Sequence, residues 1–248
     1  SKVGPALGIM LGVELVNRLN WRGMFIAIGA LSLIWLIPWC LVIPRMKLRQ
    51  EVSKIPAPSY KEILSKRAFW GTVIGLFGAN YTWYFYLTWL PYYFEKERHF
   101  SSDQLAIMGS LPFWGVALSS MLAGLGADAL IRRGRTAARV RQATVSIGLI
   151  GCCIFMFAAV LIQERALSIT LLIVACLSLG LFSSNHWALT QTLTGPEAAG
   201  KWTGVQNCLG NFAGVVAPWV TGSILGSTHS FFMAFAVACC VLIISVCG

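Results

Sequence analysis

Charged residues are scarce in this sequence: they make up 11% of its 248 residues, whereas 57% are hydrophobic. Soluble domains are about 45–50% apolar and about 25% charged. A soluble core cannot bury so large an apolar fraction, so the scarcity of charge argues against a water-soluble globular domain. We expect an all-α, polytopic membrane protein whose helices have the lipid bilayer as their solvent.

Motifs for catalysis, metal binding and nucleotide binding are also missing. The sequence has no CxxC pair, P-loop, GxGxxG or Ser-His-Asp order, and its eight cysteines all lie within apolar runs. We therefore expect no disulfide, no metal site, no cofactor and no enzyme activity. The net charge of +10 would suggest nucleic-acid binding in a soluble protein. Here the basic residues cluster between apolar runs, and we expect no nucleic-acid partner.

Apolar runs are plentiful, and eight of them are predicted as membrane helices. They cover about 3–17, 23–43, 69–91, 104–127, 142–162, 167–190, 202–225 and 229–247. The longest polar interval, 44–68, contains three prolines and is expected to link two groups of helices. Because the chain begins and ends inside apolar runs, we expect a fragment of a longer protein.

The basic residues predict the orientation of these helices. If 44–68 lies on the cytoplasmic side, 14 of the 19 Lys and Arg residues fall on that side and five on the other. This bias follows the positive-inside rule. We expect a multi-pass protein of the cytoplasmic membrane, with the 44–68 linker in the cytoplasm.

Formal charge is almost absent from the predicted spans after residue 68. The stretches 68–94, 104–127, 142–163 and 202–248 contain no Asp, Glu, Lys or Arg. An ionisable group inside a membrane is costly and usually functional. A carboxylate that couples transport to protons would therefore lie outside these helices. Glu14, the one acidic residue in a predicted span, is expected at its outer end, near the interface.

Uncharged polar side chains share helical faces within the spans. Asn80, Tyr84 and Thr88 are spaced by four residues, and so are Asn207 and Asn211. Such groups either line an aqueous cavity or form a hydrogen-bonded seam between helices, because lipid cannot solvate them. As neutral donors and acceptors they suit a small polar solute. The predicted substrate-binding residues are Asn80, Tyr84, Thr88, Ser183, Trp187, Asn207 and Asn211.

His186 lies in the interior of the predicted span 167–190. Its ordinary pKa is near neutrality, so it could act as a proton relay or contact an anion. The alternative is a histidine that is hydrogen-bonded to a neighbouring helix or lies near the inner interface. The sequence leaves both roles open.

A polar turn follows the predicted fourth span, and residues 124–135 read GLGADALIRRGR. This stretch resembles the inner-loop signature of the major facilitator superfamily, G-x-x-x-D-(R/K)-x-G-(R/K)-(R/K), with two extra residues before the basic cluster. Ala129 departs from it, since a basic residue is usual there. The resemblance implies a gate in which a carboxylate and arginines pair when the two halves close. Its residues would be Gly124, Asp128, Arg132, Arg133, Gly134 and Arg135.

Further stretches resemble the anion:cation symporter branch of this superfamily. Residues 80–91, 187–204 and 206–218 are similar to its seventh helix, the loop after its tenth helix, and its eleventh helix. Residues 4–8 and 20–25 resemble parts of its fifth and sixth helices. The resemblance makes the spans helices five to twelve of a major facilitator fold. Residues 1–43 would end the N-terminal half, 44–68 would be the linker, and 69–248 would form the C-terminal six-helix half.

The resemblance also implies a function: proton-coupled uptake of a small organic anion, a sugar acid, by alternating access around a site at mid-membrane. The expected partners are the anion, protons and the lipid bilayer, and the protein is expected to act as a monomer. The family's anion-binding arginine and protonatable acids usually lie on the first and fourth helices, which precede this sequence. The alternatives are a transporter-like receptor that binds a solute without moving it, and a passive facilitator.

Overall fold

The computed structural model describes residues 3–43 and 58–247, and all regular secondary structure in these ranges is helical. This confirms the predicted all-α fold. The helices are α1 (Val3–Leu33), α2 (Leu36–Val42), α3 (Tyr60–Leu64), α4 (Arg67–Lys96), α5 (Ser102–Met108), α6 (Leu111–Arg132), α7 (Ala137–Leu161), α8 (Arg165–Asn211), α9 (Ala213–Thr228) and α10 (Phe231–Cys247).

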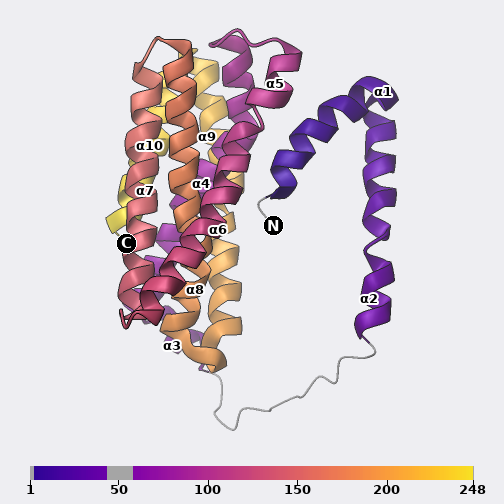
Figure 1. The fold of residues 1–248 in the computed structure, drawn as a ribbon. Helices are drawn as coiled ribbons and strands as arrows, with labels where there is room; N and C mark the ends of the chain where they lie inside the picture. Colours follow the sequence, from indigo (N-terminus) through magenta and orange to yellow (C-terminus); the bar gives the residue numbers. More distant parts are fainter. Residues whose placement is uncertain (1–2, 44–57, 248) are drawn as a thin grey trace.

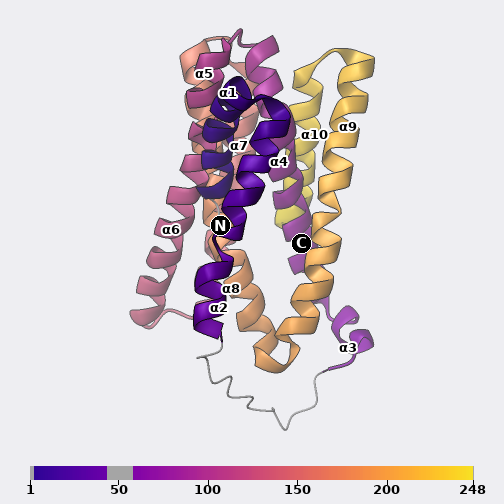
Figure 2. The same ribbon diagram turned by 90° about the vertical axis from the view of Figure 1, so that its right-hand side faces the viewer.

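Helices α4 and α6–α10 form an elongated bundle, and α1 and α2 stand beside it (Figures 1 and 2). Helix α8 is two helices in one: it bends sharply at Gly195, where φ is 70° and ψ is 171°, and Pro196 follows. The bend, the α6–α7 turn and α3 lie at one end of the bundle, which we call the α3 end. Helix α5 and the α9–α10 turn lie at the opposite end, the α5 end.

Four helical stretches in the described part of the chain are long and apolar enough to cross a membrane. These are Glu14–Val42, Leu111–Arg132, Ala137–Leu161 and Arg165–Thr228. The last has 64 residues and contains the bend at Gly195, so it traverses the bundle twice. Helix α10 is apolar but has 17 residues. Helix α4 has 30 residues but is not among the four, because its many Tyr and Trp residues and Asn80 lower its hydropathy.

The eight predicted spans all fall on helices, but three of them are interrupted. Two of the breaks come shortly before a proline. Ile34, at the first break, lies four residues before Pro38, and Met108, the last residue of α5, lies four residues before Pro112. A proline lacks the N–H that would bond to the carbonyl four residues earlier, and its ring clashes with that carbonyl. The third break, at Phe212, separates α8 from α9. The sequence-based spans were therefore wrong in being continuous at these points.

The core of the bundle is aromatic and centres on α4. Phe85 and Tyr93 of α4 pack edge-on against Phe235 of α10, with ring centroids 4.9 and 5.1 Å apart. These three side chains are at most 3% exposed. Helices α7 and α8 close the other side of this core with small and aliphatic residues, among them Cys152 and Leu172. A bundle packed in this way holds α4 rigidly between its neighbours.

The N-terminal arm, by contrast, packs on little. Helix α1 bends at Asn20, whose Oδ1 accepts hydrogen bonds from the backbone N–H groups of Arg22 and Gly23 and so caps the second segment. Near the bend, Glu14 forms an exposed ion pair with Arg18. The first segment contacts α5 and α6, and α2 has no buried residue. Apolar residues so exposed require lipid or further protein around them.

The segment that leads into α4 is docked on the α3 end of the bundle. Ser59 and Glu62 form a capping box at the start of α3, and Ile63 is 1% exposed against Phe69 and Trp202. Lys201 Nζ donates to the carbonyl oxygen of Pro58 at 3.1 Å. Within the predicted 44–68 linker, residues 58–66 therefore pack on the bundle, and 44–57 lie outside the described residues. The three-part division of the chain stays a prediction.

Candidate solute cavity and inner-end motif

A cavity of about 210 Å³ opens on one flank of the bundle, between α4, α6 and both segments of α8. We call it the central cavity. Six of the seven predicted substrate-binding residues line it: Asn80, Tyr84, Ser183, Trp187, Asn207 and Asn211. No charged side chain lines it among the described residues. The structure thus brings together groups that lie up to 131 positions apart in the chain.

A chain of hydrogen bonds crosses the cavity wall from α4 to α8. The hydroxyl of Tyr84 donates to Oδ1 of Asn211 at 3.0 Å. Nδ2 of Asn211 in turn donates to Oδ1 of Asn207 at 2.6 Å and to its backbone carbonyl at 2.9 Å. This leaves Nδ2 of Asn207 and the second lone pair of the Tyr84 oxygen for a solute. Two amides and a phenol arranged in this way can form hydrogen bonds with the hydroxyl groups of a solute.

The close approach of α8 and α9 to α4 makes this chain possible. Asn80 Nδ2 donates to the carbonyl oxygen of Gly210 at 3.1 Å, so an amide of α4 is fixed against α8. A Cβ at Gly214 would lie 2.9–3.2 Å from ring atoms of Tyr84. Glycine is therefore required at 214 if Tyr84 is to keep its place beside Asn211.

The first segment of α8 supplies the remaining wall. Ser183 is half-buried, and the indole of Trp187 is 37% exposed on the cavity side. An aromatic face and a hydroxyl opposite two amides can hold a solute with both apolar and polar edges.

Thr88 is the one predicted substrate-binding residue that does not line this cavity. It is exposed, and its hydroxyl donates to the backbone carbonyl of Tyr84 one turn earlier. Asn80, Tyr84 and Thr88 do lie on one helix at a spacing of four residues, but the cavity extends along this face only as far as Tyr84. Only the packing of the helices sets that limit.

His186 is 2% exposed and lies in a buried polar network that joins the two segments of α8 to α4. Its Nε2 is 2.7 Å from Nε2 of Gln206, whose amide also reaches the hydroxyl of Thr190 at 3.2 Å and the carbonyl of Thr72 at 3.3 Å. Trp202 Nε1 donates to the Thr72 hydroxyl at 3.2 Å. A hydrogen bond to a neighbouring helix, one of the two roles left open for His186, is present, and its partner Gln206 was not among the predicted site residues.

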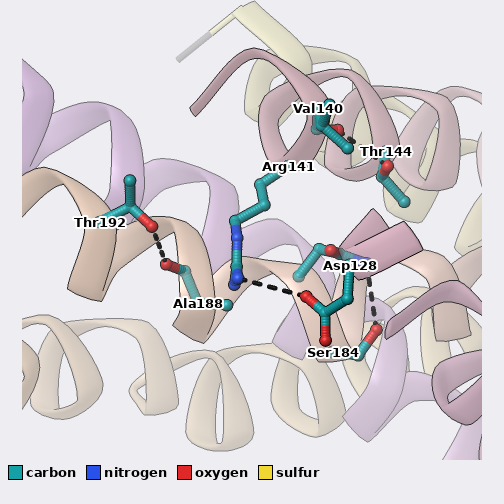
Figure 3. Close-up of polar contacts among 8 residues, drawn as sticks. Asp128, Val140, Arg141, Thr144, Ser184, Ala188 and Thr192 are labelled. Atoms are coloured by element: carbon teal, nitrogen blue, oxygen red, sulfur yellow. Dashed lines mark hydrogen bonds and ion pairs between the residues drawn. The ribbon is translucent and has the colours of Figure 1, made fainter. Parts of the chain in front are cut away.

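The inner-end motif lies at the end of α6 and in the turn that follows. In Figure 3 the Arg141 side chain extends from α7 and ends between Ala188 of α8 and Asp128 of α6. Arg141 Nη2 lies 3.5 Å from Oδ1 of Asp128, while its Nε is buried without a hydrogen-bond partner in the described structure. Gly124 faces Ser184, since a Cβ there would lie 3.9 Å from that side chain. The partner of Asp128 is thus Arg141, which the motif did not predict.

The other members of the motif shape the turn instead of pairing with Asp128. Arg133 follows the last residue of α6, Arg132, and Gly134 has φ of 88°, in the region that favours glycine. Backbone N–H groups of Arg133 and Gly134 cap the helix on the carbonyls of Ala129 and Ile131, at 3.2 and 2.9 Å. The side chains of Arg132, Arg133 and Arg135 are exposed. They are available to lipid headgroups or to a second half.

Comparison with known proteins settles the family. Residues 1–218 match the family model of the Major Facilitator Superfamily. The chain belongs to this superfamily. The assignment agrees with the helical architecture and with the inner-end motif, and it supports the prediction that the protein is an integral membrane transporter and not an enzyme.

Relatives of this superfamily chain include several anion transporters. It is 27% identical to the probable chloroplastic anion transporter 3 of Arabidopsis thaliana, over 94% of the chain and 50% of the relative. Identity to the probable L-galactonate transporter of Escherichia coli strain K12 is 23%, over 97% of the chain and 57% of the relative. Sialin of Ovis aries is 26% identical, over 90% of the chain and 49% of the relative. The chain therefore spans about half the length of the curated relatives it matches.

The fold of the chain also matches a solved transporter structure. The match is a bacterial homolog of the human lysosomal transporter Spinster, crystallised in an inward-facing and unoccupied conformation. The TM-score is 0.64 at 13% identity, with 99% of this chain and 65% of the other covered. The predicted major facilitator fold is thereby confirmed.

Proposed function

We propose that the protein carries out proton-coupled uptake of a small organic anion, a sugar acid, by alternating access. The α3 end would face the cytoplasm of a multi-pass protein in the cytoplasmic membrane, and the protein would act as a monomer. The central cavity carries the proposal: six neutral polar or aromatic side chains predicted from the sequence converge on one space. The relatives, which include a probable L-galactonate transporter and a D-galactonate transporter, suggest the substrate class.

The chemistry of the cavity supports a solute site that this chain shares with helices outside it. Its amides and its phenol can bind the hydroxyl groups of a sugar acid, but no charged group among them can neutralise a carboxylate. An arginine for the carboxylate, and any carboxyl group that carries a coupled proton, would then come from helices outside this chain. The size of the cavity agrees: ligand sites are usually about 300–1,000 Å³, and this one, at about 210 Å³, fits one wall of a shared site.

The test is uptake by the complete protein, as its host makes it, in proteoliposomes. Labelled galactonate and other sugar and aromatic acids would be offered under an inward proton gradient, with and without a protonophore. We expect saturable accumulation of a sugar acid that collapses with the protonophore. Binding without uptake would instead favour a receptor. A rate of uptake that the protonophore does not change would favour a passive facilitator.

A further inference from the structure

A second cavity, of about 260 Å³, lies within the bundle between α4, α7, α8 and α10. We call it the inner cavity. It begins among residues of the α3 end, such as Ala68, Ala138 and Leu193, and it extends to His186. Of its lining residues, only Phe182 also lines the central cavity. The inner cavity therefore runs beside the central cavity and is not a continuation of it.

The wall between the two cavities is a pair of stacked rings. The centroids of Phe182 and His186 are 4.7 Å apart, and their planes differ by 20°. On its other side, the edge of His186 meets Trp187 at 5.4 Å and 74°, and Trp187 lines the central cavity. One titratable ring thus contacts the inner cavity and also a side chain of the proposed solute site.

The lining of the inner cavity suits water. Thr72, Gln142, Ser146 and Ser245 are distributed along it among aliphatic side chains, and Gln142 at the α3 end is exposed. A buried water needs two to four polar partners and occupies about 30 Å³. The volume of about 260 Å³ is sufficient for several waters in a row. Polar groups at intervals from the surface to His186 would hold such a row in place.

Gln206 provides a second observation on the far side of His186. Its Oε1 is buried and has no hydrogen-bond partner within the described residues. Its Nε2 faces Nε2 of His186, so a neutral imidazole must accept there and carry its proton on Nδ1. An imidazolium has N–H groups on both nitrogens and can only donate. The amide would then have to turn over and present the unpaired Oε1.

We propose that the inner cavity is a water-filled path through which His186 releases its proton to the α3 end separately from the anion, and that Gln206 converts this release into movement of α8 against α4. The inference rests on the proposed function. In the step, the imidazolium of His186, whose Nε2–H donates to Gln206 Oε1, gives its Nε2 proton to a water of the inner cavity, and that water becomes a hydronium ion. The amide then turns so that its nitrogen donates to the neutral Nε2 and to the carbonyl of Thr72 on α4. Uptake of the next proton reverses the change.

No other charged or titratable side chain lines the inner cavity in the described structure. Helix α4 has no charge between residues 68 and 94, and α10 has none. On α7 the nearest charge, Arg141, is turned to Asp128. On α8 the nearest are Glu197 and Lys201, just past the bend, and Lys201 bonds to the Pro58 carbonyl. A proton on His186 would therefore be the one formal charge at this depth of the bundle.

The functional test compares His186→Gln with the wild type in the complete protein. Glutamine can still pair with Gln206 but cannot carry the proton. We expect proton-driven accumulation of labelled galactonate to fall at least tenfold, while exchange of galactonate at equal pH on both sides stays within twofold. Ser146→Leu, which narrows the inner cavity, should also lower accumulation and spare exchange. Thr144→Leu, on the same helix but outside the cavity, should change neither.

A labelling experiment tests the water path without any need for transport. Ser146→Cys should react with 2-aminoethyl methanethiosulfonate at least tenfold faster than native Cys152, which is on the same helix and 0% exposed. Peptide mass spectrometry would separate the two thiols.

Three results would overturn the inference. A His186→Gln variant that accumulates galactonate like the wild type removes His186 from the proton path. Equal loss of exchange and accumulation makes His186 a packing residue. A Ser146→Cys thiol as slow as Cys152 means that the cavity is dry. If the wild type moves no solute at all, the proposed function fails, and the labelling result alone decides whether a water path exists.

Discussion

The two ends of the bundle are each held by an arginine, and the two arginines differ in how well they are satisfied. At the α5 end, Arg98 Nη2 donates to the carbonyl of Ile162 at 2.9 Å, and its Nη1 donates to the carbonyl of Gln163 at 3.1 Å. It also reaches the hydroxyls of Ser168 and Tyr93, at 2.9 and 2.8 Å. At the α3 end, Arg141 has one ion pair of 3.5 Å and a buried Nε without a partner in the described structure.

From this difference we infer that the α5 end stays fixed and that the α3 end changes. Helix α7 ends at Leu161, and the Arg98 guanidinium satisfies the carbonyls of Ile162 and Gln163 just past that end and also reaches the carbonyl of Ala159 in the last turn at 3.4 Å. A single long ion pair with an exposed carboxylate contributes about 0–1 kcal/mol. Arg141 can therefore change partners at little cost, as a gate requires, whereas Arg98 fixes α4 to α7 and α8.

Arg98→Ala should have the largest effect on stability. It removes charge-assisted bonds and leaves backbone carbonyls unpaired, for a loss of about 2–3 kcal/mol. Thermal unfolding of the protein in detergent would measure the loss. Lys96→Ala, two residues away, is the matched control and should change little, because in the described structure the Lys96 ammonium has only an exposed ion pair with Glu95 and a distant contact of 5.9 Å with the ring of Tyr92. Equal stability of both variants would contradict the fixed role of the α5 end.

Between the two ends, Asn211→Ala should affect binding more than stability. It breaks the chain from Tyr84 to Asn207 and removes a donor and an acceptor from the central cavity. We expect the Kd for a sugar acid to rise about tenfold, which corresponds to about 1.4 kcal/mol, with nearly normal expression. Titration calorimetry on purified protein would measure it. Loss of expression in parallel with binding would assign Asn211 to helix packing instead.

The α3 end should show the smallest effect on stability. In a double-mutant cycle of Asp128→Asn and Arg141→Gln, we expect a coupling energy below about 1 kcal/mol in thermal unfolding. The same variants should change the rate of uptake, because the pair lies where the proposed gate closes. A coupling energy of several kcal/mol would show that the α3 end is as fixed as the α5 end and would remove the contrast.

Much of the candidate site follows from the sequence because helical periodicity is local. Asn207 and Asn211 share a face wherever the helix lies, and the cost of burying amides in lipid predicts that this face meets protein or water. The same reasoning placed Tyr84 and Asn80. It could not place Thr88, since the extent of a cavity depends on where the neighbouring helices diverge. It also missed Gln206, because its partner His186 lies across the bend of α8.

The sequence by itself determined the class of the protein, the approximate positions of its helices, and the superfamily resemblance. It could do so because each membrane helix must satisfy its own backbone and present an apolar surface, which are properties of single segments. Only the tertiary structure decided that Arg141 is the partner of Asp128, that Gln206 faces His186, and that two cavities flank the Phe182–His186 stack. Those contacts join different helices, and the rotation and depth of one helix against another are set by side-chain packing along their whole length.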